Sequence, residues 1–166
     1  MNTGLNPIEV PFLAGIDPAG EPVFENLVVT ILDGGDRQVQ LLRSPLLARN
    51  LAAGDKIKLI DPTAAQYELI QRSGNLAIRL FRRHQLDPLE EFLTPALEKL
   101  DGILDLASER ALVYSIHYSI GFQVIEELLN RACTTFPDTV WYYGNVYDPA
   151  DGTTPLEWWL DSEQQG

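Results

Sequence analysis

The stretch NLAIRLF, residues 75–81, decides the fold together with TVWYYGNVY, residues 139–147, which closes the segment that NLAIRLF opens. In the first stretch every second residue is a large aliphatic one, and these alternate with Ala77, Arg79 and Phe81. An alternation with period two is typical of a strand that buries one face. The second stretch is rich in aromatic and β-branched residues and also predicts a strand.

A helix is predicted after the first of these strands. Asp87 is a candidate N-cap, Pro88 suits the first helical position, and Glu90 completes a capping box. Apolar residues then recur at helical spacing up to residue 100. Pro95 interrupts this stripe, and an interior proline costs about 3 kcal/mol in a regular helix. We therefore expect a kink, or a new helix start capped by Thr94.

The remaining elements of this segment complete a known supersecondary order. Residues 103–106 are a short apolar run, and residues 110–118 predict a strand rich in Val, Tyr and Ile. Residues 122–132 carry a second apolar stripe at helical spacing before Pro137. The order strand, helix, strand, strand, helix, strand predicts a ferredoxin-like βαββαβ unit over residues 74–147. Both helices should cover the same face of its sheet.

The first half of the chain predicts a smaller, β-rich unit over residues 23–73. Residues 1–22 are rich in Pro and Gly and predict an extended arm, part of which can pair with a sheet edge. The DGGD sequence at 33–36 predicts a hairpin turn, and Ser44 with Pro45 predicts the start of a short helix.

The whole chain is therefore expected to be α+β. An N-terminal small antiparallel sheet or partial barrel should pack against the C-terminal ferredoxin-like unit. Residues 148–166 should form an acidic tail, which contains Trp158 and Trp159.

The charge of the chain is unevenly distributed. The net charge is −12. Residues 1–83 hold nine acidic and nine basic side chains, whereas residues 84–166 hold fifteen acidic and three basic ones. Such an acidic half disfavours binding to nucleic acid, whose affinity depends on Lys and Arg. It favours a basic protein partner, although a net negative charge also serves solubility alone.

The run SPLLARNLAAGDKIKLIDPTAAQYELIQRSGNLAIRL, residues 44–80, resembles a bacterial domain family of unknown function. The matching positions are Pro45, Gly54, Asp55, Ser73, Gly74 and Arg79. The resemblance extends over about residues 23–147, and it implies a small β-rich half followed by a split βαββαβ half. The family has no assigned activity, so the resemblance implies a fold and no chemistry.

The sequence contains no recognisable catalytic or cofactor motif. A single cysteine, Cys133, excludes an internal disulfide and a Cys-based zinc site within one chain. His84 and His117 do not have the spacing of a zinc motif, and Asp148 and Asp151 lack the alternation of a calcium loop. We expect no catalytic residue, metal or cofactor. Without a secretory or membrane-spanning apolar run, we expect a soluble cytoplasmic protein that does not bind a membrane.

Two hypotheses for function follow from these observations, and an enzyme is a third, which no motif supports. The first is a non-catalytic protein that binds or neutralises a basic protein partner, as an immunity protein or inhibitor does. Its predicted contacts are acidic or aromatic residues, namely Glu126, Glu127, Asp148, Asp151, Trp158 and Asp161. The second is a regulatory domain that binds a small ligand on the open sheet face or between the halves. Its predicted polar contacts are Arg79, His117 and Tyr143.

Overall fold

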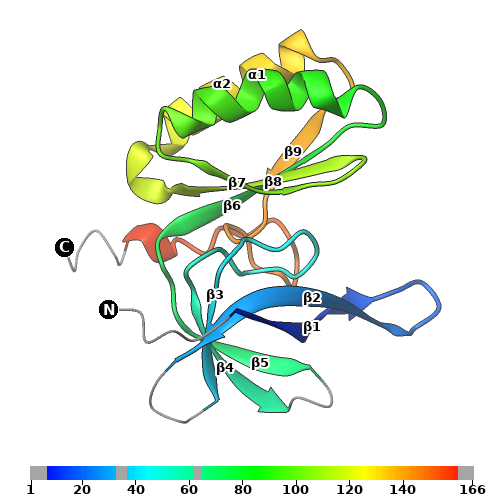
Figure 1. Cartoon of the computed structure of the whole chain (residues 1–166), viewed down its shortest axis with the longest axis vertical. Coiled ribbons are helices and arrows are strands. Elements are labelled where there is room, and N and C mark those ends of the chain that lie inside the picture. Colours follow the sequence, from blue (N-terminus) through cyan, green and yellow to red (C-terminus); the bar gives the residue numbers. More distant parts are fainter. Residues whose placement is uncertain (1–6, 33–36, 62–64, 161–166) are drawn as a thin grey trace.

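The computed structural model describes residues 7–32, 37–61 and 65–160, and it contains two antiparallel sheets stacked one above the other (Figure 1). The lower sheet has the strand order β1-β2-β3-β4-β5. Its strands are β1 Ile8–Ile16, β2 Pro22–Ile31, β3 Gln38–Leu41, β4 Lys56–Asp61 and β5 Gln66–Gln71. The Leu13 amide donates to the Ala65 carbonyl at 3.2 Å, which brings the two outer strands together. The expected small antiparallel sheet or partial barrel is confirmed.

The upper sheet has the strand order β7-β8-β6-β9, and its two long helices lie on the face away from the lower sheet (Figure 1). Its strands are β6 Asn75–Phe81, β7 Ile103–Ala107, β8 Ala111–His117 and β9 Val140–Tyr143. The helices are α1 Leu86–Glu98 and α2 Phe122–Thr135, with a short 3-10 helix, η1 Tyr118–Ile120, before α2. This arrangement is the predicted βαββαβ unit.

The hydrophobic periodicity of the sequence explains the core under the helices. Leu76, Ile78 and Leu80 are fully buried, and they pack with the apolar stripes of α1 and α2. The residues of β6 that lie between these three point to the opposite face of the strand, toward the lower sheet. In the register, Ile78 pairs with Tyr143 and Arg79 with Tyr142, so the side chains of Arg79 and Tyr143 lie on opposite faces.

Two details of α1 differ from expectation. The predicted capping box is wrong, because Gln85, in a left-handed conformation, stands at the N-cap and Asp87 lies one residue inside α1. Of the two alternatives at Pro95, the new helix start is wrong, because α1 continues through the proline. The Thr94 hydroxyl does not cap a helix and instead shares a 2.6 Å hydrogen bond with the Tyr114 hydroxyl. Packing of the apolar stripe on the sheet therefore outweighs the cost of the proline.

The N-terminal arm supplies an edge strand of the lower sheet. Part of residues 1–22 is the strand β1, which pairs along β2 from Ile8 to Ile16. The expected pairing of this arm with a sheet edge is thus present. The predicted hairpin turn at residues 33–36 lies outside the described residues.

Residues 44–55 link β3 to β4 and bind side chains of both sheets, and the short helix predicted there is wrong. Glu25, on β2 of the lower sheet, accepts hydrogen bonds from the amides of Leu46, Leu47 and Ala48 at 2.8–3.0 Å. Arg79, on β6 of the upper sheet, donates to the carbonyls of Pro45 and Ala48. Arg79 thus occupies two carbonyls that a helix would use for its own hydrogen bonds, and the segment stays irregular.

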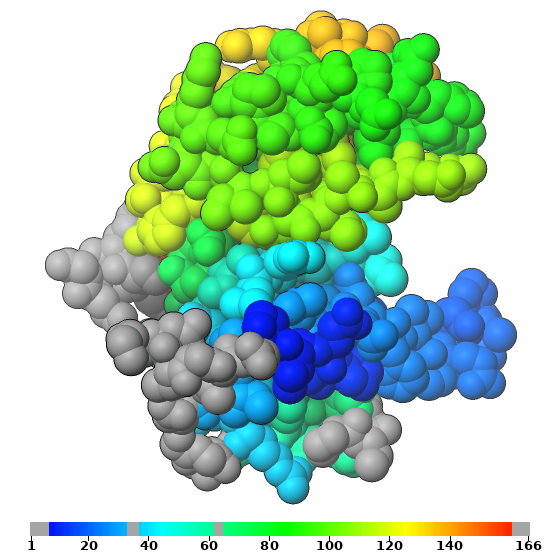
Figure 2. Space-filling view, in the orientation of Figure 1, coloured from blue at the N-terminus to red at the C-terminus, as the bar shows by residue number. Residues whose placement is uncertain are grey.

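The same segment is packed between both sheets, as the cyan atoms in Figure 2 show between the green and blue layers. Ala48 and Leu51 are fully buried and belong to the core of the lower sheet. Arg79 is 2% exposed, and its guanidinium also lies 5.8 Å from the ring centre of Tyr142. We call residues 44–55, held by Glu25 and Arg79, the junction segment.

The end of the junction segment is fixed by a buried carboxylate, that of Asp55. It accepts the Ser73 amide at 2.9 Å and the Ala52 amide at 3.0 Å, and the Ser73 hydroxyl donates to the Ala53 carbonyl at 2.7 Å. Gly54 lies against Ser73, because a Cβ built on Gly54 would stand 2.8 Å from the Ser73 Cβ. Burial raises the pKa of Asp55. Residues singled out by the family resemblance therefore meet in one structural cluster.

A second polar cluster ties the start of the junction segment to the upper sheet. The Ser44 amide donates to Asp105 Oδ2 at 2.8 Å, and the Ser44 and Ser115 hydroxyls lie 2.5 Å apart. The Ser115 hydroxyl also donates to the same Asp105 oxygen. Burial raises the pKa of Asp105 above its ordinary value of 3.8.

The close approach of Gly144 to Arg79 gives a first prediction. A Cβ on Gly144 would lie 2.9 Å from Arg79 Nε and 3.0 Å from Cζ. We expect Gly144→Ala to lower the free energy of unfolding by about 1–3 kcal/mol, because the guanidinium must move. In an Arg79→Met background this loss should largely disappear. Urea unfolding of the four proteins, as a double-mutant cycle, measures the coupling.

Gly152→Ala is the matched control for this cycle. Gly152 has φ +71 and no atom near its Cβ position, so the substitution introduces backbone strain alone. Its cost should be the same with Arg79 and with Met at that position. Equal costs of Gly144→Ala in both backgrounds would show that the guanidinium is not what opposes the methyl group.

The Asp105 cluster gives a second prediction, on pH dependence. A carboxyl whose pKa is raised by folding stabilises the protein fully below its ordinary pKa, and this contribution is lost as the pH rises through the raised value. Asp105→Asn keeps an acceptor oxygen for Ser44 and Ser115 and cannot ionise. Between about pH 4 and about pH 7, the unfolding free energy of the variant should therefore rise relative to that of the original protein. A constant difference across the pH series would contradict this.

Candidate functional site

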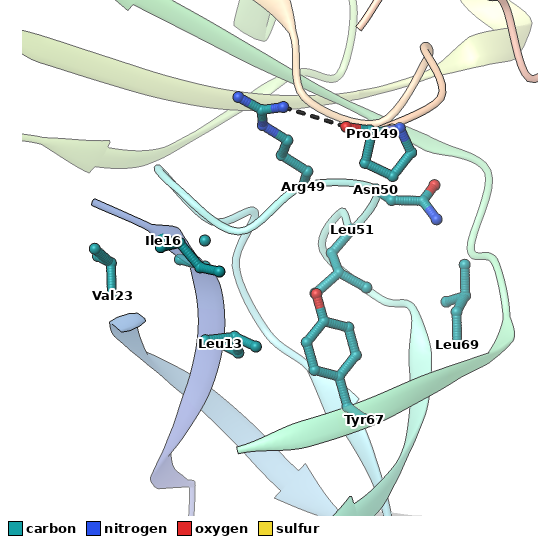
Figure 3. Close-up of a pocket in the computed structure, with 11 residues that line it drawn as sticks. Leu13, Ile16, Val23, Arg49, Asn50, Leu51, Tyr67, Leu69 and Pro149 are labelled. Atoms are coloured by element: carbon teal, nitrogen blue, oxygen red, sulfur yellow. Dashed lines mark hydrogen bonds between the residues drawn. The ribbon is translucent and has the colours of Figure 1, made fainter. Parts of the chain in front are cut away.

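A cleft with a volume of about 740 Å³ lies between the lower sheet and the junction segment. Figure 3 shows its walls, with Leu13, Ile16 and Val23 on one side and Leu69 on the other. Its lining residues are Leu13, Ala14, Gly15, Ile16, Val23, Arg49, Asn50, Leu51, Tyr67, Leu69 and Pro149. We call this space the Arg49 cleft. Its size is that of small-molecule sites, and most of its lining residues are apolar by type, although polar groups also face the space.

The upper rim of the cleft is held by the junction segment. Asn50 has a left-handed φ of 68°, which turns the chain, and its amide donates to the Gly144 carbonyl at 2.9 Å. Its side-chain oxygen accepts from Arg72 Nη2 at 2.5 Å. Arg49 Nη1 lies 3.4 Å from the Pro149 carbonyl, a long contact that Figure 3 shows at the rim. The Arg49 side chain is exposed, so its charge is available to a ligand.

Tyr67 forms the floor of the cleft. It lies on β5, points toward Leu51 (Figure 3), and its ring packs on Phe12 with centres 4.9 Å apart. Burial and the nearby charge of Glu25 raise the pKa of the Tyr67 phenol. The phenol is therefore neutral at physiological pH and can donate or accept a hydrogen bond. The cleft thus combines one cation, one phenol and apolar walls, which suits binding rather than acid–base chemistry.

A smaller hollow of about 250 Å³ adjoins the Arg49 cleft. Arg49 and Pro149 line both spaces. The other lining residues of the smaller hollow are Arg79, Tyr142, Tyr143, Gly144, Tyr147, Asp148 and Gly152. The guanidinium of Arg49 therefore stands at the boundary between the two.

Of the three predicted ligand contacts, Arg79 and Tyr143 both line the smaller hollow, whereas His117 lines neither space. The Arg79 guanidinium bonds the junction segment, whereas the Tyr143 hydroxyl donates to Glu126 Oε2 at 3.0 Å on the helix side of the sheet. This carboxylate and burial both raise the Tyr143 pKa, burial more strongly. His117 is exposed, and its Nδ1 lies 2.7 Å from the Ser119 hydroxyl.

The residues predicted to contact a basic partner are divided between two regions. Glu126 and Glu127 lie on α2, where Glu127 is exposed and Glu126 accepts from Tyr143. Asp148 and Asp151 lie in the turns that follow β9. Asp161 lies outside the described residues. Whether these residues contact a partner stays a prediction.

Two of these residues have clear local roles. The Asp151 carboxylate accepts from the Thr154 hydroxyl and from the amides of Thr153 and Thr154, and these bonds lower its pKa to about 2. Trp158 is 9% exposed, and its indole donates to the Asn145 carbonyl at 2.9 Å. Trp158 therefore completes the core of the upper sheet.

Arg49 and Tyr67 were missed as site residues by the sequence reasoning. Neither belongs to a motif, and their positions lie in different elements that only the fold brings together. The signal that could have pointed to Arg49 is a lone cation within the apolar run LLARNLAA, residues 46–53.

The described part of the chain offers neither a metal cluster nor a membrane-spanning helix. Within residues 7–32, 37–61 and 65–160, no group of three or more His, Cys, Asp and Glu side chains could hold a metal ion. No helix in these ranges is long and apolar enough to cross a membrane. Cys133 is half-buried, and burial raises the pKa of its thiol, which makes it a poorer nucleophile.

Comparisons with known proteins agree with this fold. No curated protein matches the chain significantly. A crystal structure of a hypothetical protein from Neisseria gonorrhoeae is similar, with a TM-score of 0.59 and 20% identity over 87% of this chain and 96% of that one. This likeness concerns the fold alone.

The family resemblance noted in the sequence is confirmed by a family model. It matches residues 25–135, from Glu25, which binds the junction segment, to the end of α2. The chain belongs to the family described as "Domain of unknown function (DUF4265)".

Proposed function

We propose that this protein binds a small anionic molecule with an apolar body in the Arg49 cleft. The observation that carries the proposal is the composition of the cleft: a volume of about 740 Å³, a lining in which most residues are apolar by type, and Arg49 as its one charged lining residue among those described. Small-molecule sites are typically apolar clefts of about 300–1,000 Å³ with a few polar groups that orient the ligand.

The charges of the residues that line the cleft indicate a negatively charged ligand. None of the lining residues is acidic, although the chain as a whole has a net charge of −12. An exposed guanidinium at an apolar cleft favours a carboxylate or sulfonate, to which it can donate two parallel hydrogen bonds. The neutral Tyr67 phenol can supply a further hydrogen bond.

The apolar side chains of the cleft indicate the chemistry of the uncharged part of the ligand. Leu13, Ile16 and Val23 face Leu69 across the space, with the Tyr67 ring beneath them. These groups would bury an aliphatic or aromatic body and gain roughly 25 cal/mol for each Å² of apolar surface removed from water. The proposed ligand is thus amphipathic, with its acidic group at the rim beside Arg49.

Anilinonaphthalene sulfonate is a suitable first probe, because it joins an aromatic body to a sulfonate. We expect the folded protein to bind it with a rise in fluorescence. Arg49→Gln should weaken this binding about tenfold through the lost charge-assisted hydrogen bonds. Ala14→Phe, which places a ring in the cleft, should also reduce it. Fluorescence titration measures both effects.

Arg43→Gln is the control for charge. Arg43 is exposed and lies on the same connection but does not line the cleft. It should leave the titration unchanged. If Arg43→Gln and Arg49→Gln weaken the probe equally, or if Ala14→Phe has no effect, the probe is not held in this cleft and the proposal fails.

A second proposal is that the helix layer binds a basic protein. It is supported by the outer surface of α1 and α2, where exposed acidic side chains outnumber exposed basic ones in the described residues. The acidic ones are Asp87, Glu91, Glu98 and Glu127, and the basic ones are Lys99, at the end of α1, and Arg131. An acidic surface speeds association with a basic partner and suppresses wrong ones. Glu126 is less suited to this role than Glu127, because it already accepts from Tyr143.

The partner proposal predicts a salt-sensitive interaction. The tagged protein should capture a basic protein from its own cells at about 50 mM salt and much less at about 500 mM, because exposed charge pairs are screened over this range. Glu91→Lys with Glu127→Lys should abolish the capture. Glu9→Lys with Glu68→Lys, which changes the charge equally on the lower sheet, should not. Capture that persists in the first variant would remove the helix layer as the contact surface.

A further inference from the structure

Three arginines and a histidine gather at the end of the upper sheet that lies near the start of α1. They are Arg82, Arg83, His84 and Arg110, which we call the Arg82 patch. The Arg82 amide donates to the Arg110 carbonyl at 3.0 Å, and Phe81 pairs with both Ala111 and Val140. The pairing of β6 with β8 therefore brings together basic residues that lie almost thirty positions apart in the sequence, from 82 to 110.

One member of the patch is held in place by the protein itself. Arg82 Nε donates to the Pro137 carbonyl at 3.1 Å and Nη1 to the Gln85 carbonyl at 2.9 Å. Its guanidinium also lies 5.5 Å from the ring centre of Phe136. Arg83, His84 and Arg110 are exposed, so they can move toward a ligand. A fixed cation with mobile ones around it is suited to binding an anion with several oxygens.

Two adjoining hollows lie within the patch. Their volumes are about 480 Å³ and about 240 Å³, and both are lined by Arg82, Arg83, Asp138 and Val140. Phe81 lines the smaller one, and Val140 is 61% exposed. The patch therefore offers an apolar surface beside its cations.

The local charge contrasts with that of the rest of the chain. Three arginines and a single carboxylate, that of Asp138, line the two hollows, which gives these four side chains a summed charge of about +2. The chain carries −12 overall, and residues 84–166 contain only three basic side chains. Like charges in one place repel, and a bound anion removes that repulsion. Solubility alone does not explain a positive cluster in an acidic protein.

We infer that the Arg82 patch binds a phosphate monoester of small size, with the phosphate on the arginines and an apolar or aromatic part on Phe81 and Val140. A dianion suits this patch better than a single carboxylate, because its three oxygens can accept from more than one guanidinium. The carboxylate of Asp138, which lines both hollows, repels a phosphate, and the three arginines outnumber it. This inference does not depend on the Arg49 cleft, from which none of the patch residues comes.

Phenyl phosphate and inorganic phosphate are the probes, titrated by calorimetry into the full chain at low salt. Phenyl phosphate should bind at one site, and inorganic phosphate should bind more weakly because it lacks the ring. Arg83→Gln with Arg110→Gln should weaken phenyl phosphate about tenfold or more. Both residues are exposed, so the melting temperature should stay nearly unchanged.

Lys99→Gln with Arg131→Gln is the matched control, since it removes two exposed cations from elsewhere on the same unit. It should leave the affinity for phenyl phosphate unchanged. Equal weakening by the two double variants would show attraction by overall charge alone and overturn the proposal, as would the absence of phenyl phosphate binding.

Two further measurements distinguish a small-molecule site at the Arg82 patch from a peptide-binding surface and from the Arg49 cleft. A phosphotyrosine peptide that binds where phenyl phosphate does not would assign the patch to a protein partner and overturn the small-molecule proposal. Binding of anilinonaphthalene sulfonate should be unaffected by Arg83→Gln with Arg110→Gln. The proposal for the Arg82 patch can then be disproved without affecting the proposal for the Arg49 cleft, and the reverse also holds.

Discussion

The buried guanidinium of Arg79 is the interaction on which the junction of the two sheets depends. A charge that is 2% exposed has lost most of its hydration and must find acceptors nearby. The carbonyls of Pro45 and Ala48 and the ring of Tyr142 supply them. The path of the junction segment is set by this need, and Ala48 and Leu51 then enter the core of the lower sheet. The Arg79 side chain, which belongs to the upper sheet, therefore positions residues that pack in the core of the lower sheet.

The elements of the upper sheet could be predicted because each buries one face. The alternation in residues 75–81 and the stripes of α1 and α2 leave a periodic record in the sequence, and the structure follows it. The sequence of the junction segment has no such periodic pattern. Its amides are bound by Glu25 and its carbonyls by Arg79, at sequence distances of more than twenty residues. Ser44 and Pro45 have the pattern of a helix start, but hydrogen bonds with Glu25 and Arg79, which are distant in the sequence, hold the segment in an irregular conformation.

The same reasoning explains why the candidate site was predicted less well than the fold. The Arg49 cleft takes its walls from β1, β2, β5, the junction segment and the turn at Pro149, so no short motif marks it. Arg79 was recognised from the strand pattern and from the family resemblance, and the structure gives it a place at the junction. Trp158 was singled out as a partner contact, but its indole is satisfied by the Asn145 carbonyl within the core. Tertiary partners of this kind cannot be read from local sequence.

The junction segment is at once a wall of the cleft and the joint between the two sheets. Asn50 illustrates this, because it lines the cleft while its amide holds the Gly144 carbonyl beside the Arg79 guanidinium. A molecule that presses on this wall therefore also restricts the joint. By thermodynamic reciprocity, whatever stiffens the joint must raise the affinity of the wall for that molecule by the same factor. The affinity of the proposed ligand would therefore depend on the rigidity of the contact between the two sheets.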